Sequence, residues 1–458
     1  MAEHNFDLVI LGGGSGGYAA ALRSAQLGKS VVLIEKDKLG GTCLHRGCIP
    51  TKALLHAAEV ADVVKDASHY GVQAQFGSID MNVVNTYRDG IVDRLFKGLT
   101  GLVNSKNVTV INGEGKLVGP KTIQVGGDTY TGTNVILASG SYSRSLPGLE
   151  IGGRVITSEH ALQMTFVPNK VIVLGGGVIG VEFASIWKSF GTEVTIIEGL
   201  PSLVPNEDAS VSKALERAFR KRGIDFKTGV RFSGVEQHEN GVVVSLESGE
   251  KLEAELLLVA VGRGPNTAGL GYEENGITMD RGFVLTNERL QTSVPGVYAA
   301  GDIVPGLQLA HRGFQQGIFI AEEIAGLNPA VIDESGIPKV TYCEPEIASV
   351  GLTEAKAAEK FGADNISTYE YNLGGNGKSQ ILGTAGFIKL IRRNDGPIIG
   401  VHMIGSRVGE QIGEAQLIVN WEAYPEDVAT LVHAHPTMNE AIGEAHLALA
   451  GKPLHAHA

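Results

Sequence analysis

Two cysteines, Cys43 and Cys48, lie in residues 40–52 together with three glycines and a lysine. Thiols at this spacing can bind a metal ion, remain as buried free thiols, close a structural disulfide or act as a redox dithiol. A zinc site would need a second cysteine or histidine pair nearby at the usual spacing, which this region lacks. Five residues of ideal helix rise about 7.5 Å, whereas a disulfide needs Cα atoms about 4.4–6.8 Å apart. The segment must therefore be distorted to close the bond, which Gly47 permits, and because strained, accessible disulfides are readily reduced we favour the redox dithiol.

A second reactive group lies near the end of the chain, where His435 is followed five residues later by Glu440 in the sequence His-Pro-Thr-Met-Asn-Glu. A carboxylate that holds one imidazole nitrogen leaves the other nitrogen free to act as a base. His433 is an alternative for this role, but it lacks the same sequence context.

Two similar stretches of the chain are candidates to position these groups. Leu8–Glu35 and Val171–Glu198 share ten identical residues of 28 at a constant offset of 163. Each has an apolar strand, a glycine turn, a helix and a second apolar strand that ends in an acid, which predicts a βαβ unit. In a Gly-x-Gly-x-x-Gly turn the first glycine makes the turn, the second admits a pyrophosphate and the third lets helix and strand pack closely. These glycines are Gly12, Gly14 and Gly17 in the first copy and Gly175, Gly177 and Gly180 in the second.

Glu35 and Glu198 end the second strands of these units, where a carboxylate accepts hydrogen bonds from a ribose 2′-hydroxyl. Two units predict two dinucleotides, and a common pairing that transfers electrons is FAD with a nicotinamide. A carboxylate at position 198 suits a free 2′-hydroxyl and repels a 2′-phosphate, and residues 199–212 contain neither Arg nor Lys. The second unit is therefore expected to bind NAD+ and NADH rather than the phosphorylated forms.

The segment Gly-Gly-Thr-Cys-x4-Cys-Ile-Pro-Thr-Lys after an N-terminal βαβ unit resembles the class I flavin-dependent disulfide oxidoreductases, and the resemblance covers essentially the whole chain. It implies one tightly bound FAD per subunit, with the flavin between the nicotinamide and the cysteine pair. It also implies that Cys48 is the thiol nearest the flavin, Cys43 the thiol that meets the substrate, and Lys52 a residue beside the flavin ring. Glu182, which stands where the first copy has Ala19, resembles the acid that pairs with this lysine.

Three further positions take their roles from the same resemblance. Asp302 ends a strand of small residues and resembles the acid that binds a ribityl hydroxyl of FAD. Gly262 ends a short apolar strand that resembles the one leading away from the NAD domain. His435, oriented by Glu440, resembles the catalytic base, which in this family completes the active site of the other subunit, so a homodimer is expected.

The expected fold is α/β, with two Rossmann-like FAD and NAD(P) domains and a C-terminal α+β interface domain for dimerisation. A length of 458 residues suits two to four domains. The expected boundaries are 1–146 for the first part of the FAD-binding domain with the cysteine pair, 147–266 for the NAD-binding domain, 267–336 for the second part of the FAD-binding domain and 337–458 for the interface domain.

The acid at position 198, the cysteine pair and the histidine–glutamate pair together resemble one branch of the family. Its enzymes oxidise protein-bound dihydrolipoyl groups to lipoyl disulfide and pass electrons through the Cys43–Cys48 disulfide and FAD to NAD+. The implied partners are lipoyl domains of 2-oxo acid dehydrogenase complexes or the glycine-cleavage carrier protein. A glutathione-reductase-like enzyme would have basic residues after the second unit, and a mercuric-reductase-like enzyme a C-terminal cysteine pair. A soluble transhydrogenase would lack the intact cysteine pair, whereas a structural or redox-sensing flavoprotein would keep FAD but turn over slowly.

Two stretches depart from the family pattern. His45 and Arg46 stand between the cysteines where relatives often have Asn and Val, and we hypothesise that the charge of Arg46 favours a thiolate. Residues 313–316 replace the usual acidic stretch after His311, so contacts on the flavin side are expected to differ there.

The composition excludes several other classes of protein. Lys and Arg number 38 against 50 Asp and Glu, and a net charge of −12 argues against non-specific nucleic-acid binding. The three cysteines are too few for a disulfide scaffold, and no bound metal is expected. No apolar stretch reaches the roughly 18 residues needed to span a membrane, and the first residues lack the basic start of a signal peptide. A cytoplasmic location is expected, with a mature organellar form as the alternative.

Overall fold

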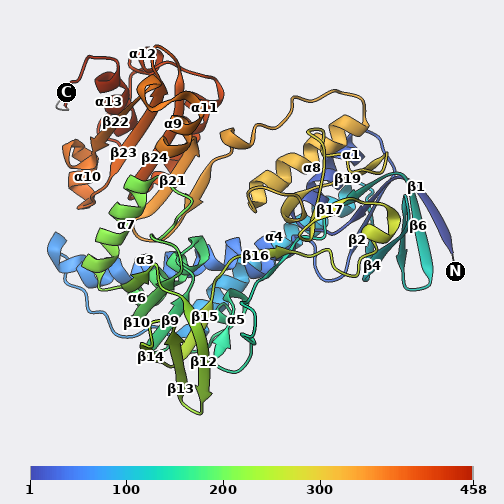
Figure 1. The fold of residues 1–458 in the computed structure, drawn as a ribbon, viewed down its shortest axis with the longest axis horizontal. Coiled ribbons are helices and arrows are strands. Elements are labelled where there is room, and N and C mark those ends of the chain that lie inside the picture. The colour runs from blue at the N-terminus through green and yellow to red at the C-terminus, as the bar shows by residue number, and fades with distance from the viewer. Residues whose placement is uncertain (1, 456–458) are drawn as a thin grey trace.

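The computed structural model describes residues 2–455 and has three lobes (Figure 1). The first lobe holds the N-terminus and helix α8, the central lobe is mainly green, and the C-terminal lobe is orange to red. The first two lobes are built on largely parallel sheets and the third on an antiparallel sheet, which confirms the expected α/β fold with a C-terminal α+β part. Within residues 2–455, none of the helices combines the length and apolar character needed to cross a membrane.

The first lobe contains a seven-stranded sheet in which β1 (Glu3–Leu11) lies between β2 (Val31–Glu35) and β6 (Asp128–Leu137), all parallel. Its central strands are buried on both faces and therefore form continuous apolar runs. A late strand, β19 (Val297–Ala299), pairs in parallel with β6, so the sheet is completed by a distant part of the chain. The remaining elements are β3 (Thr109–Asn112), β4 (Gly115–Gly119), β5 (Thr122–Val125), β7 (Ser141–Ser143), β17 (Met279–Asp280), β18 (Phe283–Val284), α1 (Ser15–Gln26), α2 (Gly41–Arg46), α3 (Cys48–Asp66), α4 (Met81–Ser105), α8 (Ala310–Ile324) and the 3-10 helices η1 (Ala67–Tyr70), η2 (Glu273–Asn275) and η3 (Gly301–Ile303).

The central lobe repeats the βαβ arrangement in a five-stranded parallel sheet of order β11-β10-β9-β15-β8. An antiparallel three-stranded sheet, β12-β13-β14, accompanies it, and β16 pairs with β7 of the first lobe. The elements are β8 (Val155–Ile156), α5 (Ser158–Ala161), β9 (Lys170–Leu174), α6 (Val178–Phe190), β10 (Glu193–Glu198), α7 (Ala209–Arg222), β11 (Asp225–Thr228), β12 (Phe232–His238), β13 (Gly241–Leu246), β14 (Lys251–Ala254), β15 (Leu256–Val259) and β16 (Arg263–Pro265).

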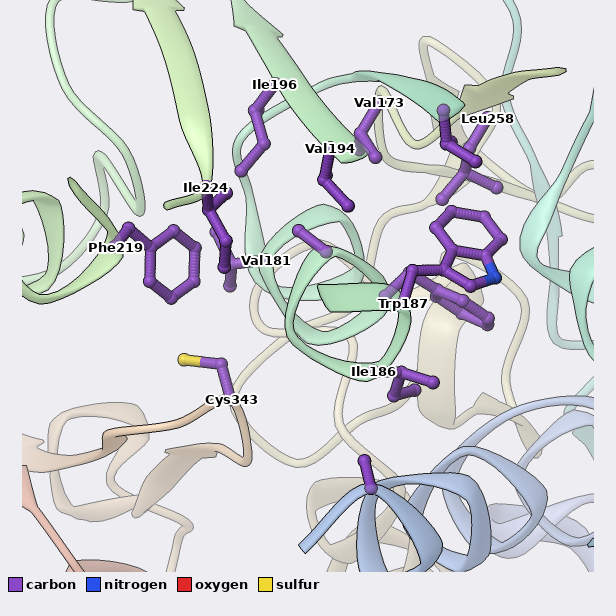
Figure 2. Packing of buried hydrophobic residues seen from close by; sticks show 14 of the residues in the cluster. Val173, Val181, Ile186, Trp187, Val194, Ile196, Phe219, Ile224, Leu258 and Cys343 are labelled. Atoms are coloured by element: carbon purple, nitrogen blue, oxygen red, sulfur yellow. The ribbon is translucent and has the colours of Figure 1, made fainter. Parts of the chain in front are cut away.

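Helix α6 is buried on nearly every side because it lies between this sheet and helix α3 of the first lobe. Figure 2 shows Trp187 of α6 close to the strand that carries Leu258 and Val181 of α6 close to Ile224, whereas Ile186 points away from the strands. The packing of α3 on α6 sets the helix of the second cysteine against the helix that follows the second glycine turn.

The C-terminal lobe has a five-stranded antiparallel sheet of order β20-β21-β24-β23-β22 with helices packed on it. Helix α7 of the central lobe lies against this sheet, and the side chain of Asp208, which caps α7, accepts a hydrogen bond from Lys389 at 2.8 Å. The elements are η4 (Glu334–Gly336), β20 (Lys339–Thr341), β21 (Glu346–Gly351), α9 (Glu354–Phe361), η5 (Ala363–Asn365), β22 (Ile366–Asn372), η6 (Leu373–Gly375), α10 (Gly377–Leu382), β23 (Phe387–Arg393), β24 (Ile398–Gly405), α11 (Val408–Asn420), α12 (Pro425–Val428) and α13 (Glu440–Leu449).

Candidate active site

Both glycine turns require glycine at their first and third positions because of close backbone packing. At Gly12 an added Cβ would lie 2.2 Å from a backbone oxygen, and φ is +108°, a region that favours glycine. At Gly17 a Cβ would lie 1.8 Å from the carbonyl oxygen of Gly12. The second turn repeats these contacts, with 2.3 Å to a backbone oxygen at Gly175 and 1.9 Å at Gly180.

The second glycine of each turn faces open space instead. The nearest atom to an added Cβ at Gly14 is the Cα of Gly41 at 4.0 Å, and at Gly177 no described atom lies within 4 Å. These glycines are the N-caps of α1 and α6, and neither helix has a side-chain cap. The first N–H groups of each helix are therefore available to an anion, so both turns fit the pyrophosphate of a dinucleotide.

The two acids tie the end of each second strand to its glycine turn. Glu35 accepts a hydrogen bond from the Gly13 N–H at 2.6 Å, and Glu198 accepts one from the Gly176 N–H at 2.7 Å. The other oxygen of each carboxylate accepts from the backbone N–H two residues further on, at 2.8 and 2.7 Å. The acids thus lie beside the turns, where the sequence placed the ribose contact.

The two cysteines belong to consecutive helices that are separated by a break at Gly47. Cys43 lies in α2 and Cys48 begins α3, while Gly47 between the helices has φ −144° and ψ −110°. Both cysteines are free thiols in this structure. The distortion that the helix geometry requires is therefore located at the predicted glycine.

The surroundings of the pair favour a thiolate on Cys48. A hydrogen bond donated by Cys43 lowers the pKa of Cys48 to about 7, with help from the charge of Lys52 and against the effect of burial. The same hydrogen bond, together with burial, raises the pKa of Cys43 far above its usual value. Cys48 also stands at the N-terminus of α3, where the helix dipole favours a negative charge.

Arg46 does not supply the positive charge that we expected of it. Its guanidinium forms an ion pair with Asp37, and both side chains are largely exposed. The cation that lowers the pKa of Cys48 is Lys52, one helical turn further along α3.

Lys52 and Glu182 form an ion pair that joins the three lobes, in which Glu182 is buried and the side chain of Lys52 is 33% exposed. The Lys52 ammonium lies 2.9 and 2.8 Å from the two carboxylate oxygens of Glu182, whose residue is 3% exposed. Glu182 also accepts a hydrogen bond from the Tyr342 N–H at 3.0 Å, and the ammonium lies 4.7 Å from the centre of the Tyr342 ring. Burial alone would lower the pKa of Lys52, but the charge and hydrogen bonds of Glu182 outweigh it and the pKa is raised.

Asp302 and Gly262 are linked through one chain of polar contacts. Asp302 lies in η3, directly after β19, and accepts a hydrogen bond from the hydroxyl of Ser141. That hydroxyl accepts a hydrogen bond from Nε of Arg263 at 2.7 Å. Gly262, with φ +105°, precedes Arg263 in the turn after β15. The contacts therefore connect the end of the central sheet with the end of β19.

His435 and Glu440 form the expected pair at the start of α13. Nδ1 of His435 lies 2.7 Å from one carboxylate oxygen of Glu440, and the other oxygen accepts from the Thr437 N–H at 2.7 Å. The imidazole is 78% exposed, and the bond between His435 and Pro436 is cis. Burial would raise the pKa of Glu440, but the hydrogen bonds from Thr437 and His435 lower it. The second ring nitrogen is left to receive a proton.

The structure brings the predicted residues together in separate groups. Each glycine turn lies with its acid, the cysteine pair lies with Lys52 and Glu182, and His435 lies with Glu440. Within residues 2–455, no hydrogen bond or ion pair joins His435 to the cysteine pair, and these groups belong to different lobes. Tyr342, Ser141 and Arg263 had no assigned role in the sequence analysis, since each contacts a partner that is distant in sequence.

A metal centre finds no support in the described part of the chain, where no three or more His, Cys, Asp or Glu side chains are grouped to hold an ion.

Comparison with protein families gives the class of protein. Residues 6–317 match the pyridine nucleotide-disulphide oxidoreductases, and residues 337–446 match the dimerisation domain of the same family. The chain therefore belongs to the pyridine nucleotide-disulphide oxidoreductase family. This confirms the family and the oxidoreductase class that the sequence predicted.

Individual relatives narrow the comparison further. The chain is 41% identical over 471 residues to a dihydrolipoyl dehydrogenase of Bacillus subtilis strain 168, which covers 98% of this chain and 99% of the relative. It is 39% identical to a mitochondrial dihydrolipoyl dehydrogenase of Pisum sativum, with 98% and 92% covered. The solved structure of LpdA from Mycobacterium tuberculosis superposes with a TM-score of 0.90 at 27% identity, covering 98% of this chain and 100% of that one. These matches confirm the branch of the family that the sequence resembled.

Proposed function

We propose that this protein is a dihydrolipoyl dehydrogenase, which oxidises protein-bound dihydrolipoyl groups to lipoyl disulfide and delivers two electrons to NAD+. The observation that carries the proposal is the cysteine pair, in which a Cys48 thiol of pKa about 7 is held beside the Lys52–Glu182 ion pair. Relatives of that name match over nearly the whole chain.

Two dinucleotide sites follow from the two glycine turns. When bound, FAD would supply two-electron chemistry between the thiols and the nicotinamide. A pocket beside the first turn is lined by Gly12, Glu35, Ser139 and Asn266, among others. The residues proposed for FAD are Gly12, Gly14, Gly17, Glu35 and Asp302, and those proposed for NAD+ are Gly175, Gly177, Gly180, Glu198 and Gly262.

The residues of the chain would carry the dithiol exchange as follows. His435, oriented by Glu440, takes a proton from one substrate thiol. The resulting thiolate attacks Cys43 of the enzyme disulfide, which forms a mixed disulfide and releases Cys48 as a thiolate. The second substrate thiol then displaces Cys43, which leaves with a proton, and lipoyl disulfide is formed. Lys52 stabilises the Cys48 thiolate throughout, since its charge lowers the pKa of that thiol.

A homodimer is part of this proposal. His435 lies in the C-terminal lobe, apart from the cysteine pair of its own chain, and residues 337–446 match a dimerisation domain. The base would thus act on the cysteine pair of the partner subunit. The partners proposed for the dimer are lipoyl domains of 2-oxo acid dehydrogenase complexes or the glycine-cleavage carrier protein. We also propose a cytoplasmic location, where free thiols are kept reduced.

The domain division proposed is that of the sequence analysis, and the sheets support it. The seven-stranded sheet takes its strands from 1–146 and 267–336, the five-stranded parallel sheet from 147–266, and the antiparallel sheet from 337–458.

The test is NAD+ reduction by dihydrolipoamide with the purified holoenzyme. We expect rapid turnover with NAD+ and little with NADP+, because Glu198 would repel a 2′-phosphate. The Cys43→Ser variant should retain FAD and lose lipoamide turnover. No turnover in the unmodified protein, with a cysteine pair that NADH still reduces, would move the substrate to a different disulfide.

A further inference from the structure

One carboxylate holds both ends of the loop that carries His435. Glu414, on α11, lies 2.7 Å from Nε2 of His433 through one oxygen. Its other oxygen accepts a hydrogen bond from the side-chain amide of Asn439 at 2.6 Å. His433 and Asn439 flank His435 on its two sides, so this carboxylate closes residues 433–439 into a loop between α11 and α13.

Glu414 and His433, which hold the loop, are largely enclosed, whereas the side chain of His435 is exposed on the surface of this chain. The side chain of His433 is 14% exposed, against 78% for His435. At Gly443 of α13 an added Cβ would lie only 2.5 Å from Nδ1 of His433, so the His433 ring packs directly on this helix. The sequence offers His433 as an alternative base, but its burial and its partner suit a different task.

The charges around His433 strengthen the contact. The hydrogen bond with Glu414 raises the pKa of His433 against the effect of burial, and the charges of Glu414 and Glu440 add to the rise. Burial would raise the pKa of Glu414, but the hydrogen bonds of His433 and Asn439 lower it. Both shifts favour the charged forms, and hydrogen bonds between charged groups are stronger than neutral ones.

We propose that Glu414 and His433 are a positioning pair, which fixes residues 433–439 and so holds the exposed His435 where it can take a proton from the substrate thiol. The inference rests on the proposed function. Among the described side chains, only Glu440 is hydrogen-bonded or ion-paired with His435, so the ring is placed by this one contact and by the loop that carries it. Placement matters because a shift of about 1 Å in a reacting group can slow a reaction roughly 100-fold.

The first test is Glu414→Gln, which keeps the shape but leaves an amide N–H facing one of the two donors. We expect kcat/KM for dihydrolipoamide to fall roughly 10- to 100-fold. Reduction of the bound flavin by NADH does not use His435, so its rate should be unchanged. This rate is measured from the loss of flavin absorbance. His433→Gln should have a similar effect, and the double variant should be no slower than either single one, because residues that act as a unit are not additive.

Glu444→Gln is the matched control. Glu444 also lies on α13 and holds a histidine, with the N–H and Nδ1 of His455 each 2.9 Å from a carboxylate oxygen. Among the described residues, Glu444 forms a hydrogen bond or ion pair only with His455. Its loss should therefore leave both half-reactions, reduction by dihydrolipoamide and reduction by NADH, unchanged.

The outcomes separate the positioning role from a merely structural one. Slowing of both half-reactions in Glu414→Gln, additive effects in the double variant, or unchanged kcat/KM would each overturn the proposal. Hydrogen–deuterium exchange of residues 433–439 gives a readout without turnover: it should be faster in Glu414→Gln than in Glu444→Gln, and equal exchange would also overturn it. Failure of the proposed function would show differently, since the unmodified protein would then not oxidise dihydrolipoamide at all.

Discussion

The reactivity of Cys48 depends on two neighbours, Cys43 and Lys52. Cys43 donates a hydrogen bond to it, and Lys52 places a positive charge one helical turn away. Both effects stabilise the thiolate, which is the nucleophilic form of cysteine.

Alkylation of the reduced protein, after removal of the FAD expected to lie against Cys48, should therefore follow the pKa of this thiol. Its rate with iodoacetamide is expected to rise with pH around a midpoint near 7, because the thiol is neutral below that pH and ionised above it. Lys52→Gln should move the midpoint to higher pH, since the stabilising charge is removed. Mass spectrometry after short exposure identifies the modified residue.

Arg46→Gln is the control, because its charge is already paired with Asp37. It should leave the midpoint unchanged. Cys343 should stay unmodified over the same range, since burial raises the pKa of its thiol well above the usual value. A midpoint near 9 in the unmodified protein would contradict the account of Cys48.

His435→Gln tests the base directly. Its loss should slow dihydrolipoamide oxidation by roughly 10²–10⁴, the usual contribution of general-base catalysis. The step is measured by stopped-flow reduction of the oxidised enzyme, and reduction by NADH serves as the control that should not change. An undiminished rate with dihydrolipoamide would assign the proton to another group.

Spacing predicted one contact between residues near in sequence, whereas the pairing of Glu182 with Lys52, 130 positions away, was expected only from the family resemblance. Glu440 is five positions from His435, and this spacing predicted that its carboxylate holds the imidazole. Lys52 is four positions from Cys48, but the charge beside the thiolate was expected from Arg46 instead. Glu182 accepts from the backbone of Tyr342, which is 160 positions away. That contact depends on how α6 meets the segment before β21, which is a property of packing and not of local sequence.

Among the structural elements, the two turn–helix units separate the packing role of glycine from its binding role. A Cβ added at Gly180 would lie 1.9 Å from a backbone oxygen, whereas a Cβ added at Gly177 would have no described atom within 4 Å. In this short segment, a substitution at Gly180 should therefore disturb the fold, whereas one at Gly177 should disturb only the binding of the ligand.

Gly180→Ala and Gly177→Ala should have opposite effects. Gly180→Ala is expected to lower the melting temperature, because forced overpacking costs about 1–3 kcal/mol. Gly177→Ala should leave the melting temperature unchanged but weaken NADH binding, since its methyl group would occupy the space for the pyrophosphate. Calorimetry and NADH titration of the FAD-loaded protein measure the two effects. Equal melting temperatures for both variants would show that the third glycine is not required by packing.

The packing of α8 on α1 is a contact between helices that the sequence pattern did not predict. The sequence marked residues 313–316 only as a departure from the family pattern. In the structure Gln316 accepts a hydrogen bond from the Gly301 N–H at 2.7 Å, which holds the turn before Asp302. An added Cβ at Gly317 would lie 2.2 Å from the carbonyl oxygen of Gly16, so the two helices approach through glycines. The helices could be predicted, but this contact between them required the fold.

In the molecule as a whole, a buried ionic network joins the central and C-terminal lobes. Asp208 accepts from the ammonium of Lys389 at 2.8 Å and from the Glu354 N–H at 3.0 Å, and the side chains of Asp208 and Lys389 are 2% and 8% exposed. Burial would raise the pKa of Asp208, but these hydrogen bonds outweigh it and the pKa lies well below its usual value. Its stabilising effect is therefore complete above about pH 4, the pKa of an unfolded aspartate, and is lost as the pH falls further.

Asp208→Asn should lower the melting temperature at pH 7, because Lys389 loses its buried partner and keeps only Glu354, which is about half exposed. Removing one partner of a buried pair costs at most roughly 3–5 kcal/mol. The difference from the unmodified protein should shrink as the pH falls below about 4. Calorimetry between pH 3 and pH 7 would show this trend. Asp280→Asn, which removes an exposed ion pair with Arg281, should have little effect at any pH. A difference that stays constant down to pH 3 would rule out Asp208 as the titrating group.

The late arrival of β19 in the first sheet also governs how the chain can fold while it is being made. β6 ends at Leu137, but its neighbour β19 begins only at Val297, after the central lobe has been synthesised. At about 5–20 residues per second, the ribosome needs roughly 10–30 s to deliver that strand. During this interval residues 135–137 of β6 lack their partner strand, although β5 already pairs with the start of β6, and such an unpaired edge invites wrong strand pairing. The central lobe, whose strands are contiguous in the chain, can close first and shorten the search of β19 for its place.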